Sequence, residues 1–341
     1  MPYNPALDGV RALSILAVVS FHCGTPWSGG GAIGLDVFFV LSGYLITSLL
    51  VDEHRNGGIE IGRFYARRAL RLYPTLLLLL AAYLALAPVL WPTDDRWLIA
   101  GLSGLYLMDY GLAFWDLPTS IGHTWSLGVE EKFYLLWPFL LPLLLRTRRP
   151  IRWLLAAFFA VTAWRYFVAG TWGWKQAYFS FDTRMSGILL GAIAALARLE
   201  ISRLTVTIAA MALAITFVAP PFMPSLPSRS PVEGVTLAMS LAEISAFVLI
   251  SYVAKHAHSA FLASRPMVYI GKLSYGIYIW HWLPLTVLWN TQHHPWWLTL
   301  SATLLFTFPM AALCLHFVDT PIKRWRERLR PTSSTPVPAL R

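Results

Sequence analysis

The sequence predicts an all-α polytopic membrane protein, with ten spanning helices and one further apolar segment near residues 98–114 that is re-entrant or peripheral. Three observations lead to this prediction. Of the 341 residues, 57% are hydrophobic and only 13% are charged, which is more apolar surface than a soluble domain can bury. Several apolar runs approach the roughly 20 residues that a spanning helix needs. Lys and Arg gather in alternate connections, as expected for cytoplasmic loops.

Taken in order, the apolar segments set the topology. They lie at 12–27, 35–51, 72–91, 98–114, 127–145, 152–168, 183–197, 204–219, 234–254, 267–289 and 297–318. All basic connections reach the cytoplasm only if the segment at 98–114 does not cross the membrane. Its Gly101, Gly104 and Asp109 fit an irregular element buried in protein. We therefore expect both termini in the cytoplasm, and a misplaced segment boundary is the competing explanation.

Composition, net charge and cysteine positions also limit the possible domains and partners. We expect one membrane domain over 5–325 and a basic cytoplasmic tail over 326–341 that is disordered at its end. The net charge of +10 could indicate nucleic acid, but its placement in the connections indicates membrane lipid instead. Cys23 and Cys314 lie within apolar runs and give neither a disulfide framework nor a metal-type spacing. We expect no nucleic acid and no metal.

The first segment carries an ionisable residue near each end, Arg11 and His22. On a helix, His22 returns to within roughly 20° of the face of Arg11, and the two lie roughly 16 Å apart along the axis. Ionisable groups inside a membrane helix are costly, and they are therefore functional candidates. The alternative is an anchoring arginine at the interface and a histidine bonded into the bundle.

An acidic residue, Asp36, stands at the start of the second segment, on the outer side where the first helix ends. A carboxylate beside an imidazole can fix its tautomer and stabilise the imidazolium. We therefore expect Asp36 to assist His22. The alternative is that Asp36 caps the helix N-terminus. Ser42 and Gly43, farther along this segment, allow close helix packing.

Two arginines, Arg68 and Arg71, share a face where the third helix enters the membrane from the cytoplasm. Guanidiniums at that position suit a phosphorylated soluble ligand. The alternative is anchoring to the cytoplasmic surface and to lipid phosphate.

A third group of polar residues lies in GHTWSLGVEEKFYLLWP, residues 122–138. His123, Glu130 and Glu131 are expected at the outer mouth of this helix, with only one of the glutamates facing inward, because neighbours point about 100° apart. The alternative is a charged interfacial cap. Near the end of the chain, His281 lies within an apolar helix, and we expect it to be a hydrogen-bonded histidine of the bundle.

Together these segments resemble the acyltransferase-3 family of integral-membrane O-acyltransferases. The matching motifs occur in the family's order: Arg11 followed after ten residues by His22, FFVLSGYLIT, the pair Arg68 and Arg71 before Pro74, TWSLGVEEKFY, LSYGIYIWH and an Asp-Thr-Pro close. They cover about residues 5–325. Asp319 of the last motif stands where many members have Glu, and its role is open.

The resemblance implies a ten-helix core that transfers an acyl group, usually acetyl, from a cytoplasmic acyl-CoA to a hydroxyl, commonly on a sugar. It implies that His22 is the essential histidine and Arg11 its motif partner. It implies further that Arg68 and Arg71 meet the CoA phosphates and that Glu130 and Glu131 are the family's acidic pair. A bacterial inner membrane is the expected location.

Acyl transfer to an alcohol needs a base, and a neutral imidazole such as that of His22 can serve near pH 7. Cys23 beside it as an acyl carrier is the weaker hypothesis, because the two side chains point about 100° apart on a helix. The sequence leaves the acceptor open: it could be a polysaccharide, a glycolipid or a secondary metabolite. It also leaves the acyl group open between acetyl, succinyl and a longer chain. The rival class is a polytopic transporter of a lipid-linked sugar, but the sequence shows no internal repeat of the kind common in transporters. The sequence says nothing of oligomeric state.

Overall fold

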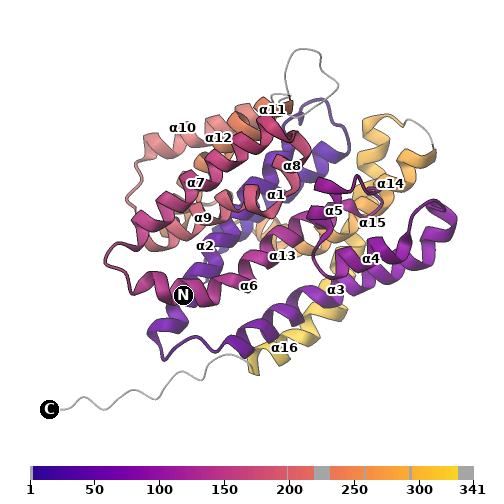
Figure 1. Cartoon of the computed structure of the whole chain (residues 1–341). Helices are drawn as coiled ribbons and strands as arrows, with labels where there is room; N and C mark the ends of the chain where they lie inside the picture. The colour runs from indigo at the N-terminus through magenta and orange to yellow at the C-terminus, as the bar shows by residue number, and fades with distance from the viewer. Residues whose placement is uncertain (1–2, 198, 219–230, 257–258, 292–293, 329–341) are drawn as a thin grey trace.

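The computed structural model describes residues 3–197, 199–218, 231–256, 259–291 and 294–328. No strand occurs among these residues, and helices of very unequal length follow one another along the chain. Figure 1 shows them gathered into one bundle. The all-α prediction is therefore confirmed. Of the predicted tail, residues 326–328 end the last helix, and residues 329–341 lie outside the described residues.

Three long helices open the chain: α1 (Pro5–His22), α2 (Gly34–Arg55) and α3 (Ile61–Leu90). The others are α4 (Arg96–Gly104), α5 (Met108–Phe114), α6 (Trp125–Leu145), α7 (Pro150–Thr171), α8 (Trp174–Phe179), α9 (Phe181–Ala197), α10 (Arg203–Val218), α11 (Pro231–Glu233), α12 (Met239–Lys255), α13 (Arg265–Trp280), α14 (Trp282–Thr291), α15 (Trp296–Leu313) and α16 (Thr320–Arg328). Short 3₁₀ turns, η1 (Gly31–Ile33) and η2 (Gly122–Thr124), precede α2 and α6, and π-helical turns, η3 (Gly234–Ala238) and η4 (Cys314–Asp319), adjoin α12 and α15.

Seven helical stretches of the described residues are long and apolar enough to cross a membrane: Pro5–His22, Gly31–Arg55, Ile61–Leu90, Pro150–Thr171, Trp174–Ala197, Gly234–Lys255 and Trp296–Lys323. The predicted number of ten is therefore not confirmed. Three predicted segments do not qualify, for different reasons. Helix α6 carries three charged residues in succession, α10 has only 16 residues, and the segment predicted at 267–289 breaks at His281 into α13 and α14.

The segment at 98–114 is irregular, as its composition predicted. It forms the short helices α4 and α5, which are separated by a turn in which Tyr106 has a φ of 57°. Lys132 of α6 holds this turn, because its ammonium donates to the carbonyl oxygen of Tyr106 at 2.6 Å and to the buried carboxylate of Asp109 at 2.7 Å. At nine and seven residues, neither helix reaches the roughly 20 residues of a membrane span.

We expect Lys132→Met to loosen this segment, because it leaves the Asp109 carboxylate buried without its cation. An unpaired buried polar group costs about 1–3 kcal/mol. Thermal unfolding in lipid nanodiscs and hydrogen exchange of residues 98–114 would measure the effect. The double variant Lys132→Met/Asp109→Leu should regain most of the lost stability, and failure of the single variant to destabilise the segment would contradict this role.

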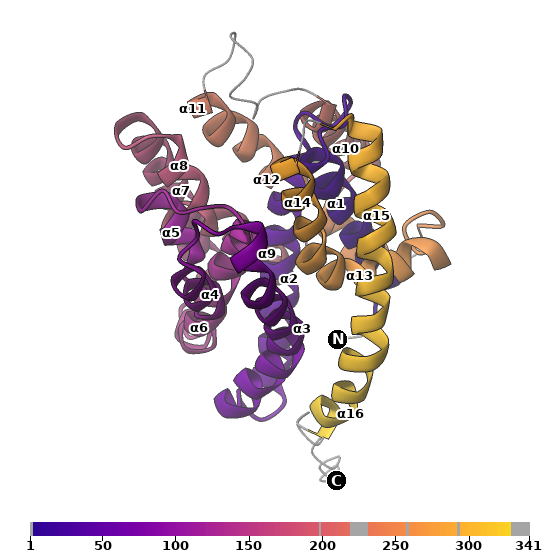
Figure 2. The ribbon, with the colours of Figure 1, turned by 90° about the vertical axis from the view of Figure 1, so that its right-hand side faces the viewer.

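Close helix contacts position the core. A Cβ atom on Gly43 of α2 would overlap the carbonyl oxygen of Ile188 of α9, and one on Gly191 of α9 would overlap that of Val40 of α2. The predicted close packing at Gly43 is thus confirmed, since α2 and α9 touch backbone to backbone in the manner of small-residue contacts in membranes. Helices α1 and α13 also pack against each other, and α15 lies beside α13 (Figure 2).

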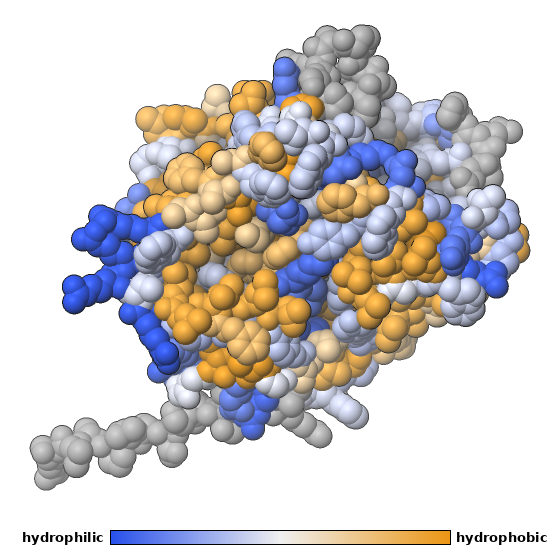
Figure 3. Space-filling view, viewed as in Figure 1, coloured by the Kyte–Doolittle hydropathy of each residue, from blue (hydrophilic) through white to orange (hydrophobic). Residues whose placement is uncertain are grey.

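The outer surface suits a lipid environment. Figure 3 shows large apolar areas over the helices, with strongly hydrophilic side chains projecting at the left-hand end of this view. Exposed large apolar side chains occur on many helices, including Leu77, Leu135, Phe159, Met211 and Leu305. Exposed apolar area on this scale is unfavourable in water and favourable against lipid tails. The chain is therefore a membrane protein.

Candidate active site

Three histidines from distant parts of the chain meet in the bundle. His22 ends α1, His123 lies in η2 before α6, and His281 lies at the break between α13 and α14. Nδ1 of His22 lies 3.1 Å from Nε2 of His281, and the centroids of the His123 and His281 rings are 5.5 Å apart. His123 and His281 are buried, whereas His22 is partly exposed. We call these three residues the histidine cluster. The expected hydrogen-bonded histidine at 281 is confirmed, and its partner is His22.

Main-chain groups and one indole fix the cluster. Nδ1 of His281 lies 2.7 Å from the carbonyl oxygen of Tyr278, and Nε2 of His123 lies 3.2 Å from that of Ile279. The Trp282 ring stacks on His123 and meets His22 edge-on, with centroids 5.5 and 4.7 Å apart. Removal from water and the neighbouring His281 hold the pKa of His123 well below its ordinary value.

A second group joins charges that the sequence placed on opposite sides of the membrane. Glu130 and Glu131 of α6 both lie close enough to Arg68 and Arg71 of α3 to interact with them electrostatically. The expectation that only one of the two glutamates faces inward is therefore wrong, and their position at the outer mouth stays a prediction. Side chains of α3 reach α6 here, since the Tyr65 hydroxyl donates to the carbonyl oxygen of Leu135. We call these four residues the arginine–glutamate cluster.

Polar and aromatic partners orient part of this cluster. The Tyr134 hydroxyl donates to Oε2 of Glu130 at 3.1 Å and also bonds to the hydroxyl of Ser42. The Arg68 guanidinium lies 4.1 Å from the centroid of the Tyr134 ring. Oε1 of Glu131 is buried without a hydrogen-bond partner among the described residues. Arg71 is exposed, so this cluster can be reached by a soluble ligand.

Helices α6 and α13 connect the two clusters. His123, in η2 directly before α6, precedes Glu130 of α6 by seven residues, which is about 10 Å of helical rise. Along α13, Tyr275 donates to the carbonyl oxygen of Leu72 near the arginines, and Tyr278, one turn later, donates to the carbonyl oxygen of His123. The histidine cluster and the arginine–glutamate cluster are thus linked through residues of the same two helices, α6 and α13.

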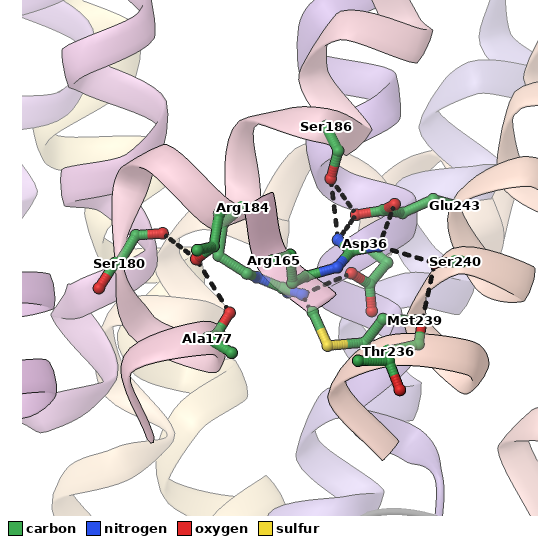
Figure 4. Close-up of polar contacts among 11 residues, drawn as sticks. Asp36, Arg165, Ala177, Ser180, Arg184, Ser186, Thr236, Met239, Ser240 and Glu243 are labelled. Atoms are coloured by element: carbon green, nitrogen blue, oxygen red, sulfur yellow. Dashed lines mark hydrogen bonds and ion pairs between the residues drawn. The ribbon is translucent and has the colours of Figure 1, made fainter. Parts of the chain in front are cut away.

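Asp36 does not join His22. Its carboxylate pairs with the guanidinium of Arg184 of α9 at 3.0 Å, and both side chains are buried (Figure 4). The expected assistance to His22 is therefore wrong, because the partner of Asp36 comes from a helix almost 150 residues later. The alternative, a helix cap, does not hold either, because α2 has no side-chain cap. The Arg184 guanidinium also lies within 5.1–5.6 Å of the ring centroids of Phe39, Trp125 and Tyr178.

A second buried ion pair lies beside the first. Arg165 of α7 makes two hydrogen bonds to the Glu243 carboxylate of α12, at 2.7 and 3.0 Å, and neither side chain is exposed. The hydroxyls of Ser186 and Ser240 complete the contacts of the Arg165 guanidinium (Figure 4). This pair joins α7 and α12 through buried charges, and Ser186 adds α9 through its hydroxyl.

The candidate functional residues predicted from the sequence did not include Arg165, Arg184 and Glu243. Each is a lone charge in or beside an apolar segment, which is the same signal that singled out His22. Applied to every segment, that rule would have found all three. Arg11, the other residue chosen by it, pairs with Asp8 one turn earlier on α1 at 3.0 Å.

The all-helical membrane bundle is the architecture that the motifs predicted, whereas the meeting of the arginines with the glutamates was not predicted. The acyltransferase-domain model Acyl_transf_3 matches residues 4–318, and the chain therefore belongs to the acyltransferase-3 family. This confirms the resemblance drawn from the motifs.

Curated relatives with similar sequences carry more specific names. The peptidoglycan O-acetyltransferase OatA of Listeria monocytogenes is 31% identical, over 94% of this chain and 56% of its own length. The O-acetyltransferase OatA of Staphylococcus aureus is 29% identical, over 94% and 57%, and the putative peptidoglycan O-acetyltransferase YrhL of Bacillus subtilis is 30% identical, over 94% and 55%. The chain thus spans a little over half the length of these relatives. No solved structure matches it.

Proposed function

We propose that this protein is a membrane O-acyltransferase that moves an acetyl group from a cytoplasmic acyl-CoA to a hydroxyl of a carbohydrate. The observation that carries the proposal is the partly exposed imidazole of His22, which ends a membrane helix and bonds to a second, buried imidazole. Acyl transfer to an alcohol requires a base at the attacking hydroxyl, and a neutral imidazole is the usual one near pH 7.

In this proposal the arginine–glutamate cluster receives the donor. Arg68 and Arg71 follow the cytoplasmic connection between α2 and α3, and guanidiniums bind phosphate oxygens in a charge-assisted, often bidentate manner. The flexible arm of the donor then extends along α6 and α13 toward the histidine cluster. Oε1 of Glu131 is buried without a hydrogen-bond partner in the part of the chain that the structure describes. This supports a polar ligand there, because buried polar atoms are otherwise hydrogen-bonded.

The acceptor in this proposal is a hydroxyl of a cell-wall glycan, reached from the outer side of a bacterial inner membrane. The relatives named as peptidoglycan O-acetyltransferases support this choice. The basic connections, which favour the cytoplasm, support placing both termini there. A glycolipid acceptor would use the same chemistry, with the hydroxyl arriving from within the bilayer.

The test is donor turnover by the full chain in lipid nanodiscs, with acetyl-CoA and soluble peptidoglycan fragments. We expect release of free CoA and a gain of one acetyl group on the glycan, both followed by mass spectrometry. Release of neither CoA nor acetylated product, by protein shown to be folded, would contradict the proposal. Flux of a lipid-linked sugar without acylation would favour a transporter.

The arginine pair gives a further expected result. Arg68→Ala and Arg71→Ala should each weaken donor binding about 10- to 100-fold, because each removes charge-assisted hydrogen bonds worth about 1.5–3 kcal/mol. Isothermal titration with CoA would measure the change. Arg63→Ala is the matched control, since Arg63 lies earlier on α3 in an exposed pair with Glu60. An equal loss in all three variants would indicate nonspecific surface charge instead of a phosphate site.

A further inference from the structure

The two hydrogen bonds of His281 determine where its proton lies. Nδ1 of His281 lies 2.7 Å from the carbonyl oxygen of Tyr278, which can only accept. Nδ1 must therefore carry the hydrogen. A neutral imidazole carries one N–H, so Nε2 of His281 has a lone pair and accepts a hydrogen bond.

The hydrogen of His22 is assigned by the same argument. Its Nδ1 lies 3.1 Å from Nε2 of His281, and two lone pairs cannot face each other at that distance. Nδ1 of His22 must therefore be the donor. Nε2 of His22 then keeps the lone pair, and no hydrogen-bond partner for that atom occurs among the described residues. This is the atom that can take a proton.

A charged His281 would reverse this assignment, but its surroundings disfavour the charge. The side chain is fully buried, and its ring neighbours are His22, His123, Tyr278 and Trp282. None of them carries a negative charge at neutral pH. An isolated buried cation is strongly unfavourable, so both members of the bonded pair are neutral at rest.

We propose that His281 is a positioning residue that holds His22 in the tautomer with a hydrogen on Nδ1 and a free lone pair on Nε2. This proposal rests on the proposed acyltransferase function for its catalytic consequence. In many catalytic triads a carboxylate orients the imidazole and stabilises the imidazolium. His281 occupies the place of that carboxylate. Asp36, the expected candidate for that place, pairs with Arg184 instead.

The reaction step balances with this arrangement. The acceptor hydroxyl oxygen forms a bond to the thioester carbonyl carbon while Nε2 of His22 takes the hydroxyl proton. The C–S bond then breaks, and the same proton passes from Nε2 to the leaving thiolate. The products are an acetyl ester and free CoA, and His22 returns to its neutral tautomer. While His22 is charged, its bond to His281 is charge-assisted and therefore stronger.

Two amide substitutions separate positioning from packing. His281→Gln places an amide oxygen near the position of Nε2, where it can accept from His22. His281→Asn places its amide near Nδ1, where it can bond to the Tyr278 carbonyl but cannot reach His22. We expect kcat to fall about 10- to 100-fold in His281→Asn, as for loss of a hydrogen bond to a charged group, with little change in the KM for acetyl-CoA. His281→Gln should retain most of the activity.

A second measurement reads the tautomer without any turnover. Solid-state NMR of the ¹⁵N-histidine-labelled full chain in bilayers distinguishes protonated from unprotonated ring nitrogens. The signals of His22 are identified by their loss in His22→Ala. We expect the Nδ1–H tautomer of His22 in the wild type and in His281→Gln, and the other tautomer or a mixture in His281→Asn.

The outcomes are distinguishable. An Nε2–H tautomer of His22 in the wild type would overturn the proposal, as would wild-type kcat in His281→Asn. If the expected tautomers are found but no chain transfers acetyl, the positioning role stands and the proposed function fails. If His281→Asn does not fold, the wild-type spectrum and the activity of His281→Gln still test whether His281 sets the tautomer of His22.

Discussion

His22→Ala is expected to lower acetyl transfer by about 10²- to 10⁴-fold, the contribution typical of a general base. The reason is the position of the imidazole. It ends α1, it is partly exposed, and its Nδ1 is bonded to a buried neutral partner. No carboxylate is hydrogen-bonded to it among the described residues, and the neighbouring imidazoles of His123 and His281 are buried. The measurement is the rate of acetylated glycan formation under saturating acetyl-CoA.

A control is needed because the substitution also removes a contact with the Trp282 ring. His256→Ala is suitable, since His256 is an exposed histidine at the end of α12 and should change nothing. CoA binding should survive in His22→Ala, because the arginines proposed to bind the donor lie on α3. Retention of more than a tenth of the wild-type rate would show that another group accepts the proton.

Glu243→Gln is expected to destabilise the fold by about 3–5 kcal/mol, the typical cost of removing one member of a buried ion pair. Arg165 would keep its charge but lose its bonded carboxylate, and the nearby Asp36 is already paired with Arg184. The hydroxyls of Ser186 and Ser240 would still accept its hydrogen bonds. The free energy of unfolding in detergent or nanodiscs would measure the loss.

The matched variant is Arg165→Met/Glu243→Leu, which replaces both charges with apolar groups of similar size. Such replacements are often neutral or stabilising, so the double variant should regain most of the stability of the wild type. Asp116→Asn serves as a surface control, because Asp116 pairs with Lys175 in an exposed position and should contribute little. Equal stability of Glu243→Gln and the wild type would mean that internal water or a neighbouring group compensates the charge.

Local patterns predicted much of this molecule. Length, apolar runs and basic connections gave the helical membrane class, and the glycines at 101 and 104 marked the irregular segment before α6. The same approach could not give the number of spans. In the first half of α6, Glu130 and Glu131 interact with Arg68 and Arg71, and Lys132 pairs with Asp109. Helix α13 ends at Trp280, directly before His281 of the histidine cluster. Both departures from a plain apolar span occur where the candidate site lies.

Pairing across the chain was the harder problem. Asp36 and His22 are near in sequence and on the same predicted side, yet each has a partner from a distant helix: Arg184 for one and His281 for the other. Sequence proximity gives no information on which of several buried charges will meet. Only the packing of α2 on α9 and of α1 near the α13–α14 break decides these partners.

The buried pair of Arg165 and Glu243 also bears on how the chain enters the membrane. The two residues are 78 positions apart, and at about 5–20 residues per second the second is synthesised about 4–16 s after the first. During that interval Arg165, in the second half of α7, lacks Glu243. An arginine at the centre of a lone membrane helix costs about 2.5–3.5 kcal/mol, which sets the scale of this cost. This cost favours holding α7 against earlier helices or the insertion machinery, away from lipid, until α12 arrives. We therefore expect membrane insertion of this protein to depend on the order in which its helices leave the ribosome.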